Sequence, residues 1–238
     1  MGSTAETALE DWFESPLGAR VLREEAALAT LALDNVFGFE LLQVGAWGPA
    51  RHLLTGARTQ HTTLLAPELT QGVTLCAPLD TLPFKSDSID AILLPHTLEL
   101  VEDPYAVLRE AERVLTGEGC LMICGFNPYS GWGGRRLFGR HFGRRAFPPE
   151  SRRMLSERRL RDWVALLGFD VDSVHGYLGF LPLTGGTAEF HPRRALTAGA
   201  YLLKARKRVS TLTLVRPRRR VRQRVLVGAA EPTNKVGS

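Results

Sequence analysis

Cysteine is scarce in this chain, and its spacing suits neither of the structures that cysteines usually build. Cys76, Cys120 and Cys124 are the three cysteines of the 238-residue sequence. An odd number, with no Cys-x-x-Cys pair and no nearby histidine, is typical neither of a disulfide scaffold nor of a zinc site. All three lie in apolar stretches. We therefore expect buried thiols in a reducing compartment, and no bound metal.

Long hydrophobic runs are also missing. No apolar run of the sequence approaches the roughly 20 residues that a membrane-spanning helix needs. The N-terminus lacks the basic and then apolar pattern of a signal peptide, so we expect a soluble, cytoplasmic protein. The 44% of hydrophobic residues is enough for a core, and the length fits one large domain, alone or with an appendage.

Acidic residues are rare in the second half of the chain. Residues 1–130 contain 7 Lys and Arg against 18 Asp and Glu, whereas residues 131–238 contain 23 against 7. Two stretches hold most of the excess: residues 131–161 with ten Arg and two Glu, and residues 204–224 with ten basic residues and no acid. This asymmetry predicts an anionic partner, either a small molecule, a nucleic acid or a membrane surface. No pattern in the sequence predicts an oligomeric state.

The middle of the chain has the pattern of a strand, a helix and a second strand. Ile89 to Leu94 is an apolar run of the length of a buried strand. From Pro104 to Leu115 the apolar residues recur at helical spacing with charged residues between them, which predicts an amphipathic helix. Gly117 and Gly119 are expected to end that helix, and Leu121 to Cys124 to form the next strand. Such a unit crosses over right-handed into a parallel sheet.

The same stretch carries a resemblance to a known family. Residues 82–123 contain, in order, Leu-Pro-Phe, a small polar turn, an Asp before an apolar strand, Leu-Glu, Asp-Pro, a helix ending in Arg-Val-Leu, and a Gly-rich turn. This order resembles the middle of class I S-adenosylmethionine-dependent methyltransferases of the type 11 group. The resemblance implies an α/β, Rossmann-like sheet of seven strands in the order 3-2-1-4-5-7-6, flanked by helices. It also implies S-adenosylmethionine as cofactor and methyl transfer to an unidentified acceptor. An unrelated α/β crossover is the alternative.

The resemblance also divides the chain. Residues 1–38 are expected to form an N-terminal helical extension and residues 39–208 the methyltransferase-like domain. Residues 130–152 are a basic insert, at the place where class I methyltransferases carry substrate-recognition elements. Residues 209–238 are expected to form a basic arm that is partly disordered.

Apolar runs and end signals predict the other elements of this domain. Ser156 is a suitable N-cap for a helix that reaches Leu167, and Gly168 follows directly. The remaining strands are expected at 39–44, 62–66, 73–77, 169–177 and 200–206.

The first strand runs into Gly45-Ala46-Trp47-Gly48-Pro49, where the family has its Gly-rich loop. Glycine is needed where the backbone passes against a cofactor, and the following helix N-terminus can face the methionyl carboxylate. The resemblance implies that the cofactor is bound by residues at the ends of the first, third and fourth strands, namely Gly45, Ala46, Gly48, Leu79, Asp80 and Pro95.

Some positions of this cofactor site depart from the family pattern. Neutral or cyclic residues replace an acid or a glycine at Gln43, Trp47, Pro49, Ala66 and Pro78. Each missing acceptor costs on the order of 1 kcal/mol, which together weakens binding by one or two decades. These departures favour an alternative, an inactive methyltransferase-like module that binds RNA or another anionic partner through its Arg-rich segments. A dehydrogenase is disfavoured because the first loop lacks Gly-x-Gly-x-x-Gly.

His96 follows the fourth strand, at the edge where ligands lie in open α/β sheets. It is either a general base that takes a proton from the methyl acceptor, or a histidine that packs or starts a helix. Trp12 and Phe13 in the N-terminal extension are expected either to cover the substrate cleft or to pack in the core.

The acceptor is expected to be bound by four residues that follow the fifth strand in the sequence. Asn127 lies in an Asn-Pro-Tyr sequence that predicts a turn at the edge of the cleft. Trp132, Arg135 and Arg136 lie in the basic insert, where Arg can bind a carboxylate or a phosphate through paired donors and an aromatic ring can stack. A small-molecule or anionic substrate is therefore expected. Contact of the insert with RNA or an anionic membrane surface, and a solvated mobile loop, are the alternatives.

Overall fold

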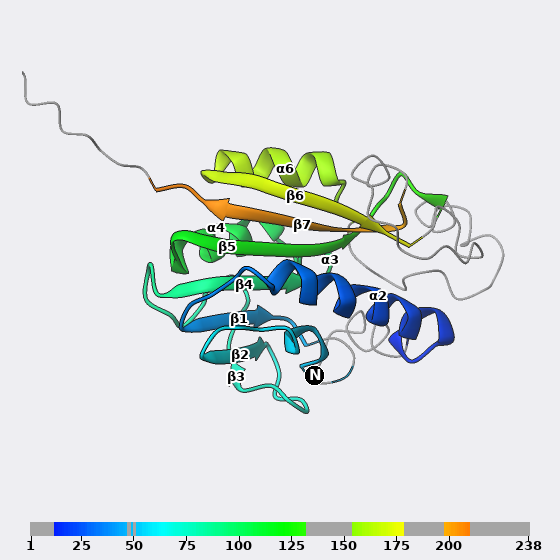
Figure 1. Ribbon diagram of the computed structural model, residues 1–238, viewed down its shortest axis with the longest axis horizontal. Coiled ribbons are helices and arrows are strands. Elements are labelled where there is room, and N and C mark those ends of the chain that lie inside the picture. Colours follow the sequence, from blue (N-terminus) through cyan, green and yellow to red (C-terminus); the bar gives the residue numbers. More distant parts are fainter. Residues whose placement is uncertain (1–11, 47–48, 50, 132–153, 179–197, 210–238) are drawn as a thin grey trace, which may run out of the picture.

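The computed structural model describes residues 12–46, 49, 51–131, 154–178 and 198–209. These residues form a seven-stranded sheet in the order β3-β2-β1-β4-β5-β7-β6 (Figure 1). Strand β7 runs antiparallel to β5 and β6, and the other neighbouring pairs are parallel. The predicted fold class and strand order are confirmed. The strands are β1 (Glu40–Val44), β2 (His61–Ala66), β3 (Leu75–Cys76), β4 (Ile89–Pro95), β5 (Leu115–Phe126), β6 (Phe169–Tyr177) and β7 (Ala200–Lys207).

Helices cover both faces of this sheet. They are α2 (Pro16–Leu33), the short 3-10 helix η1 (His52–Leu54), α3 (Thr97–Leu100), α4 (Pro104–Val114) and α6 (Glu157–Leu166). Along β4 the side chains alternate between two cores: Ala91 and Leu93 pack with α2 and η1, whereas Ile92 and Leu94 pack with α4 and α6. This alternation follows from the two-residue period of a strand and explains why β4 is apolar from Ala91 to Pro95. No helix among the described residues is long and apolar enough to cross a membrane.

The ends of α2 and α6 follow from local sequence signals. Ser15 precedes α2, and its hydroxyl accepts a hydrogen bond from the Gly18 amide at 3.1 Å. Ser156 caps α6 in the same way, through the Arg159 amide, and Gly168 follows in the left-handed region with φ of +86°. Serine caps supply an acceptor for amides that have no partner within the helix. The predicted helix at 156–167 is confirmed to within a residue.

The prediction that Gly117 and Gly119 end helix α4 is wrong. The helix ends at Val114, and β5 begins directly at Leu115, which pairs with Ile89 of β4. The pairing register shifts between Ile89 and Ala91, so an irregularity in the strand accommodates both glycines.

The prediction of three buried thiols is wrong for one of them. Cys120 and Cys124 lie in β5 and are buried, but Cys76 is exposed because β3 is a two-residue strand at the edge of the sheet. Burial raises the pKa of the Cys120 thiol to about 11 and that of Cys124 well above its usual range. The thiols in β5 are therefore protonated and unreactive at neutral pH.

A hydrogen-bonded pair on α4 explains why two parts of the family motif occur together. Arg113 donates to the carbonyl oxygens of Leu82 and Phe84 at 3.0 Å each, and Glu110 accepts from the Leu82 amide at 2.9 Å. Arg113 and Glu110 also bond each other at 2.8 Å. The Arg of Arg-Val-Leu thus holds the Leu-Pro-Phe turn that leads into β4.

Substituting Arg113 with alanine is expected to lower the free energy of unfolding by about 1–3 kcal/mol, because two backbone carbonyls lose a charged donor. Denaturant unfolding measures this. Arg109→Ala, on an exposed position of the same helix, is the matched control and is expected to change stability by less than about 0.5 kcal/mol. Equal effects from the two variants would contradict the role given to Arg113.

Candidate functional site

Several strands end at one edge of the sheet and bring the predicted site residues together. Strands β1, β4 and β5 run parallel to one another in the sheet (Figure 1). Gly45, His96 and Asn127 follow these strands and therefore lie at the same edge. Strand β6 ends there too, because Tyr177 and Phe126 both pair with Ala200 at the start of β7. Ligands bind at this carboxyl edge in open α/β sheets.

Gly45 turns the chain sharply after β1. Its φ of +99° lies in the left-handed region, which favours glycine. The residue is buried, and its amide donates to the carbonyl oxygen of Leu65 in β2 at 2.8 Å. Ala46 after it is partly buried. The backbone is thus bare of a side chain at the point where the predicted cofactor would approach.

Gln43 presents a buried acceptor beside this turn. The side chain is 2% exposed, and its amide nitrogen donates to the carbonyl oxygen of Gly45 at 2.9 Å. A carbonyl oxygen only accepts, so Nε2 and not Oε1 must be the atom that bonds Gly45, which fixes the amide orientation. Within the described part of the chain, this Oε1 has no hydrogen-bond partner. An unpaired buried acceptor costs about 1–3 kcal/mol, which a ligand with an N–H donor would recover.

The other predicted cofactor residues lie near this edge. Pro95 is buried at the end of β4, Leu79 is buried among apolar side chains of β1, β4 and α4, and Asp80 is exposed. Gly48 and Trp47 lie outside the described residues. Cofactor contact by this set stays a prediction.

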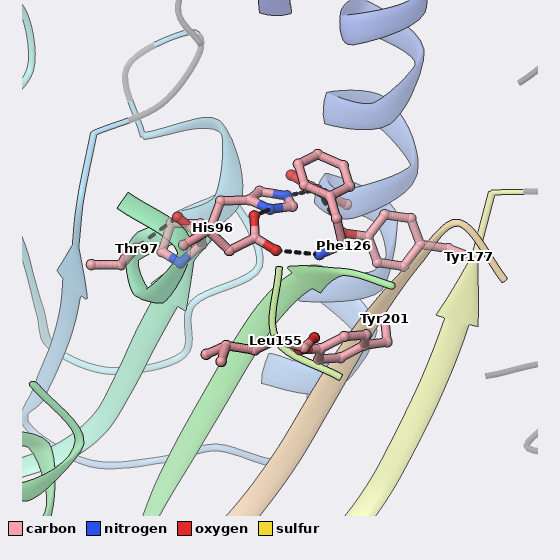
Figure 2. A network of polar contacts seen from close by, with 9 residues as sticks. His96, Thr97, Phe126, Leu155, Tyr177 and Tyr201 are labelled. Atoms are coloured by element: carbon pink, nitrogen blue, oxygen red, sulfur yellow. Dashed lines mark hydrogen bonds and ion pairs between the residues drawn. The ribbon is translucent and has the colours of Figure 1, made fainter. Parts of the chain in front are cut away.

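His96 lies in a buried polar network (Figure 2). Its Nδ1 is 3.0 Å from Oε2 of Glu99, and its Nε2 is 2.5 Å from Oε1 of Glu25 in α2. The hydroxyl of Tyr177 donates to the same Glu25 oxygen at 2.6 Å, and the amide of Phe126 donates to Oε1 of Glu99 at 2.6 Å. The rings of His96 and Phe126 stack with centroids 4.1 Å apart. Residues of α2, α3 and β5 therefore contact this imidazole, and Tyr177 of β6 joins the network through Glu25.

Residues 47–123 match the sequence pattern of the family described as "Methyltransferase domain". The solved structure of an S-adenosylmethionine-dependent methyltransferase from Thermotoga maritima has the same fold, with a TM-score of 0.60 and 19% identity over 84% of this chain and 94% of that chain. The chain therefore has the class I methyltransferase fold, and its residues 47–123 match the type 11 methyltransferase domain family.

Two curated relatives match part of the chain. The protein YafS of Escherichia coli K12 is 37% identical over 139 residues, 58% of this chain and 55% of that protein. The malonyl-[acyl-carrier protein] O-methyltransferase of Halorhodospira halophila is 35% identical over 75 residues, 32% of this chain and 25% of that protein. The chain spans about half the length of the curated relatives it matches first. These matches do not support the alternative of an inactive binding module.

The charge state of His96 follows from its carboxylate neighbours. Burial works to lower the pKa of His96, but the charge and hydrogen bond of Glu25, followed by those of Glu99, outweigh burial and raise the pKa to about 10. Burial raises the pKa of Glu99, and the hydrogen bond from His96 opposes that rise. The pKa of the Tyr177 phenol is also raised, by burial and then by Glu25. These shifts favour a protonated imidazole at the carboxyl end of β4.

This arrangement does not suit His96 as a direct general base. A base needs a free ring nitrogen within reach of the acceptor, yet both nitrogens of His96 face carboxylate oxygens and the side chain is 0% exposed. The residue also starts α3, in a left-handed backbone conformation with φ of +52°. Of the two predicted roles, the geometry favours the histidine that packs and starts a helix.

The sequence prediction missed Glu25 and Tyr177. A signal for Glu25 was available, because it falls on the same helical face as Val21, Leu22 and Leu28, all buried in α2. A carboxylate on an apolar face requires a buried partner. No comparable signal marks Tyr177, since aromatic residues are common in strands.

The N-terminal aromatic residues pack against the same network. Phe13 is 3% exposed and lies 6.1 Å from the His96 ring, centroid to centroid, while Trp12 lies 6.0 Å from Phe126 and is partly buried. Of the two predicted roles, core packing is confirmed for Phe13.

On the acceptor side, the predicted turn at Asn127 is confirmed. Its Oδ1 accepts from the amide of Tyr129 and its Nδ2 donates to the carbonyl of Ala198, each at 3.0 Å. These bonds fix the turn, and substrate contact by Asn127 stays a prediction. Trp132, Arg135 and Arg136 lie outside the described residues. No group of metal-ligating side chains occurs in the described ranges.

Proposed function

We propose that this chain is an S-adenosylmethionine-dependent methyltransferase that binds its cofactor at the carboxyl end of β1. The observation that carries the proposal is the unpaired, buried Oε1 of Gln43 beside the left-handed turn at Gly45. In this chain Gln43 takes the place of the family's acid, and an amide oxygen can accept from the methionyl ammonium as a carboxylate does. The family match and the fold support the same conclusion.

The proposed site uses the chain mainly to hold and orient the cofactor. Gly45, Ala46 and Gly48 would let the backbone approach it, and the exposed Asp80 would offer a carboxylate beside Leu79 and Pro95. The bound cofactor supplies an activated methyl group on a sulfonium. What remains for the protein is to align the acceptor with that methyl group and exclude water.

The proposed acceptor is a small-molecule or anionic compound, held on the side of Asn127 by Trp132, Arg135 and Arg136. The excess of arginine after residue 131 supports an anionic acceptor. A nucleic acid is also anionic and is therefore included among the proposed acceptors. A cytoplasmic location is also proposed, because the thiols of Cys76, Cys120 and Cys124 are free.

Calorimetric titration with S-adenosylmethionine tests the proposal through Gln43. We expect wild-type binding, and about 10-fold or greater weakening in Gln43→Leu, because the variant loses a hydrogen bond to a charged donor worth about 1.5–3 kcal/mol. Its stability is expected to change little, since the unpaired acceptor is removed together with one hydrogen bond.

Gln60→Leu makes the same chemical change at an exposed position just before β2 and is expected to bind like the wild type. If the wild type gives no heat up to millimolar cofactor, the proposed function is wrong. If Gln43→Leu binds as tightly as Gln60→Leu, Gln43 does not belong to the site.

A further inference from the structure

We propose that Glu25, Glu99 and Tyr177 keep His96 as a buried imidazolium, and that this cation is a positioning residue that ties helix α2 to the cofactor turn. The inference rests on the proposed function for its effect on cofactor binding. The charge state of the His96 ring and its contact with Glu25 of α2 are argued from the described structure alone and do not depend on the proposed function.

The buried network around His96 joins segments that are far apart in the sequence. Glu25 bonds His96 across 71 positions and Tyr177 across 152, so one carboxylate joins α2, the end of β4 and the end of β6 (Figure 2). Both carboxylates and the imidazole are at most 3% exposed. Water therefore cannot replace a missing partner, and each bond depends on the others being made.

The donors and acceptors around His96 must also balance. An ionised carboxylate only accepts, and both His96 nitrogens face carboxylate oxygens. A neutral imidazole has one N–H and would leave one carboxylate facing a lone pair. Either the imidazole carries both protons, or one carboxyl group carries a proton and donates it to the ring, Glu99 to Nδ1 or Glu25 to Nε2. Each carboxyl group accepts a further hydrogen bond, Glu99 from the Phe126 amide and Glu25 from the Tyr177 hydroxyl, and such bonds favour the ionised form of both and hence a doubly protonated ring.

Hydrogen bonds also connect His96 to the turn at Gly45. The His96 amide donates to the carbonyl oxygen of Cys124 at 3.0 Å, which fixes the backbone of β4 against β5. The hydroxyl of the next residue, Thr97, donates to the carbonyl oxygen of Val44 at 2.5 Å. Val44 directly precedes Gly45. A change at the His96 ring therefore reaches the proposed cofactor turn through a single intervening side chain.

The consequence is a dependence of cofactor affinity on a carboxylate that lies on α2. Among the described residues, the titratable groups around His96 are Glu25 from α2 and Glu99 from α3, which contact the ring, Tyr177 from β6, which bonds Glu25, and Cys124 from β5, whose carbonyl accepts from the His96 amide. With Glu25 present, the ring keeps its proton until the pH rises through about 10. Without that carboxylate the ring is expected to lose its proton near the ordinary histidine value of about 6.5.

Long-range ¹H–¹⁵N correlation of the histidine rings in the full chain tests the charge state directly. The sequence has six histidines, and His96→Gln identifies the signal of interest. At about pH 8 we expect two protonated nitrogens on His96, above the ordinary pKa of histidine. A His96 ring with one bare nitrogen at that pH overturns the proposal, whatever the variants do.

Glu25→Gln and Glu24→Gln test the tie to the cofactor turn. Both remove one negative charge from α2, but Glu24 bonds Arg20 and the Leu178 amide instead of His96. Wild type and Glu24→Gln are expected to bind S-adenosylmethionine equally at about pH 6 and about pH 8.5, whereas Glu25→Gln is expected to bind about 10-fold more weakly at the higher pH.

If the affinity for S-adenosylmethionine depends on pH equally in Glu25→Gln and Glu24→Gln, the proposed coupling between α2 and the cofactor turn is wrong. If no protein of the series binds the cofactor at either pH, the proposed function fails, while the ring-nitrogen experiment still decides the charge state. Hydrogen exchange of residues 16–33 provides a second readout that needs no ligand. The protection factors of these amides, in which the observed rate is corrected for base-catalysed intrinsic exchange, are expected to fall with rising pH in Glu25→Gln but not in Glu24→Gln.

Discussion

Gly45→Val is expected to weaken binding of S-adenosylmethionine by about 100-fold or more while the sheet stays folded. The branched side chain would fill the space beside the backbone where β1 ends, and glycine is favoured there because φ is +99°. Calorimetry measures the affinity, and thermal unfolding followed by circular dichroism measures the fold.

Gly168→Val separates backbone strain from loss of the cofactor site. Gly168 has φ of +86°, and a Cβ there would meet no atom within 4 Å. Both variants are expected to lose about 1–3 kcal/mol of stability to strain. Only Gly45→Val is expected to lose the cofactor. Wild-type affinity in both variants would place the cofactor elsewhere.

His96→Leu is expected to lower the free energy of unfolding by about 3–5 kcal/mol near neutral pH, because it leaves the carboxylates of Glu25 and Glu99 buried without their cationic partner. Denaturant unfolding measures the loss. The folded-state pKa of His96 is raised to about 10, so its contribution is full below the unfolded value of about 6.5 and is lost as the pH rises through about 10. The effect of the substitution should therefore shrink with increasing pH.

His61→Leu, at an exposed position at the start of β2, is the matched control and is expected to change stability by less than about 0.5 kcal/mol. The double variant Glu25→Leu/His96→Leu is expected to lose less than the sum of its single substitutions, because removing both partners leaves fewer unpaired charges. Additive losses would mean that Glu25 and His96 do not act as a pair.

Local signals were sufficient to predict most of the sheet. The strand predicted at 169–177 is observed as Phe169–Tyr177, between a glycine in the left-handed region and a turn. Strand β5 was predicted too short, because its first residues are polar and Gly-rich and join the sheet only through pairing of Leu115 with Ile89. Residues that become part of a strand only because a neighbouring strand pairs with them need not show the alternation of apolar and polar residues that predicts a strand.

The candidate site could be predicted only in part. The rule that parallel strands end at one edge places Gly45 and His96 together, as observed. The buried network around His96 could not be found this way, because Glu25 lies 71 positions from His96, which it bonds, and Tyr177 lies 152 positions from Glu25, which it bonds. Those contacts depend on how α2 and β6 pack on the finished sheet, and a single sequence does not encode that packing in any local pattern.

The central claim is that the cofactor occupies the turn after β1. Crystals grown with S-adenosylhomocysteine, the demethylated product of the cofactor, test it most directly. We expect ligand density against the backbone of Gly45, with the α-ammonium within hydrogen-bond distance of Oε1 of Gln43. Density at a different edge of the sheet, or none at millimolar ligand with Oε1 of Gln43 still unpaired, would contradict the claim.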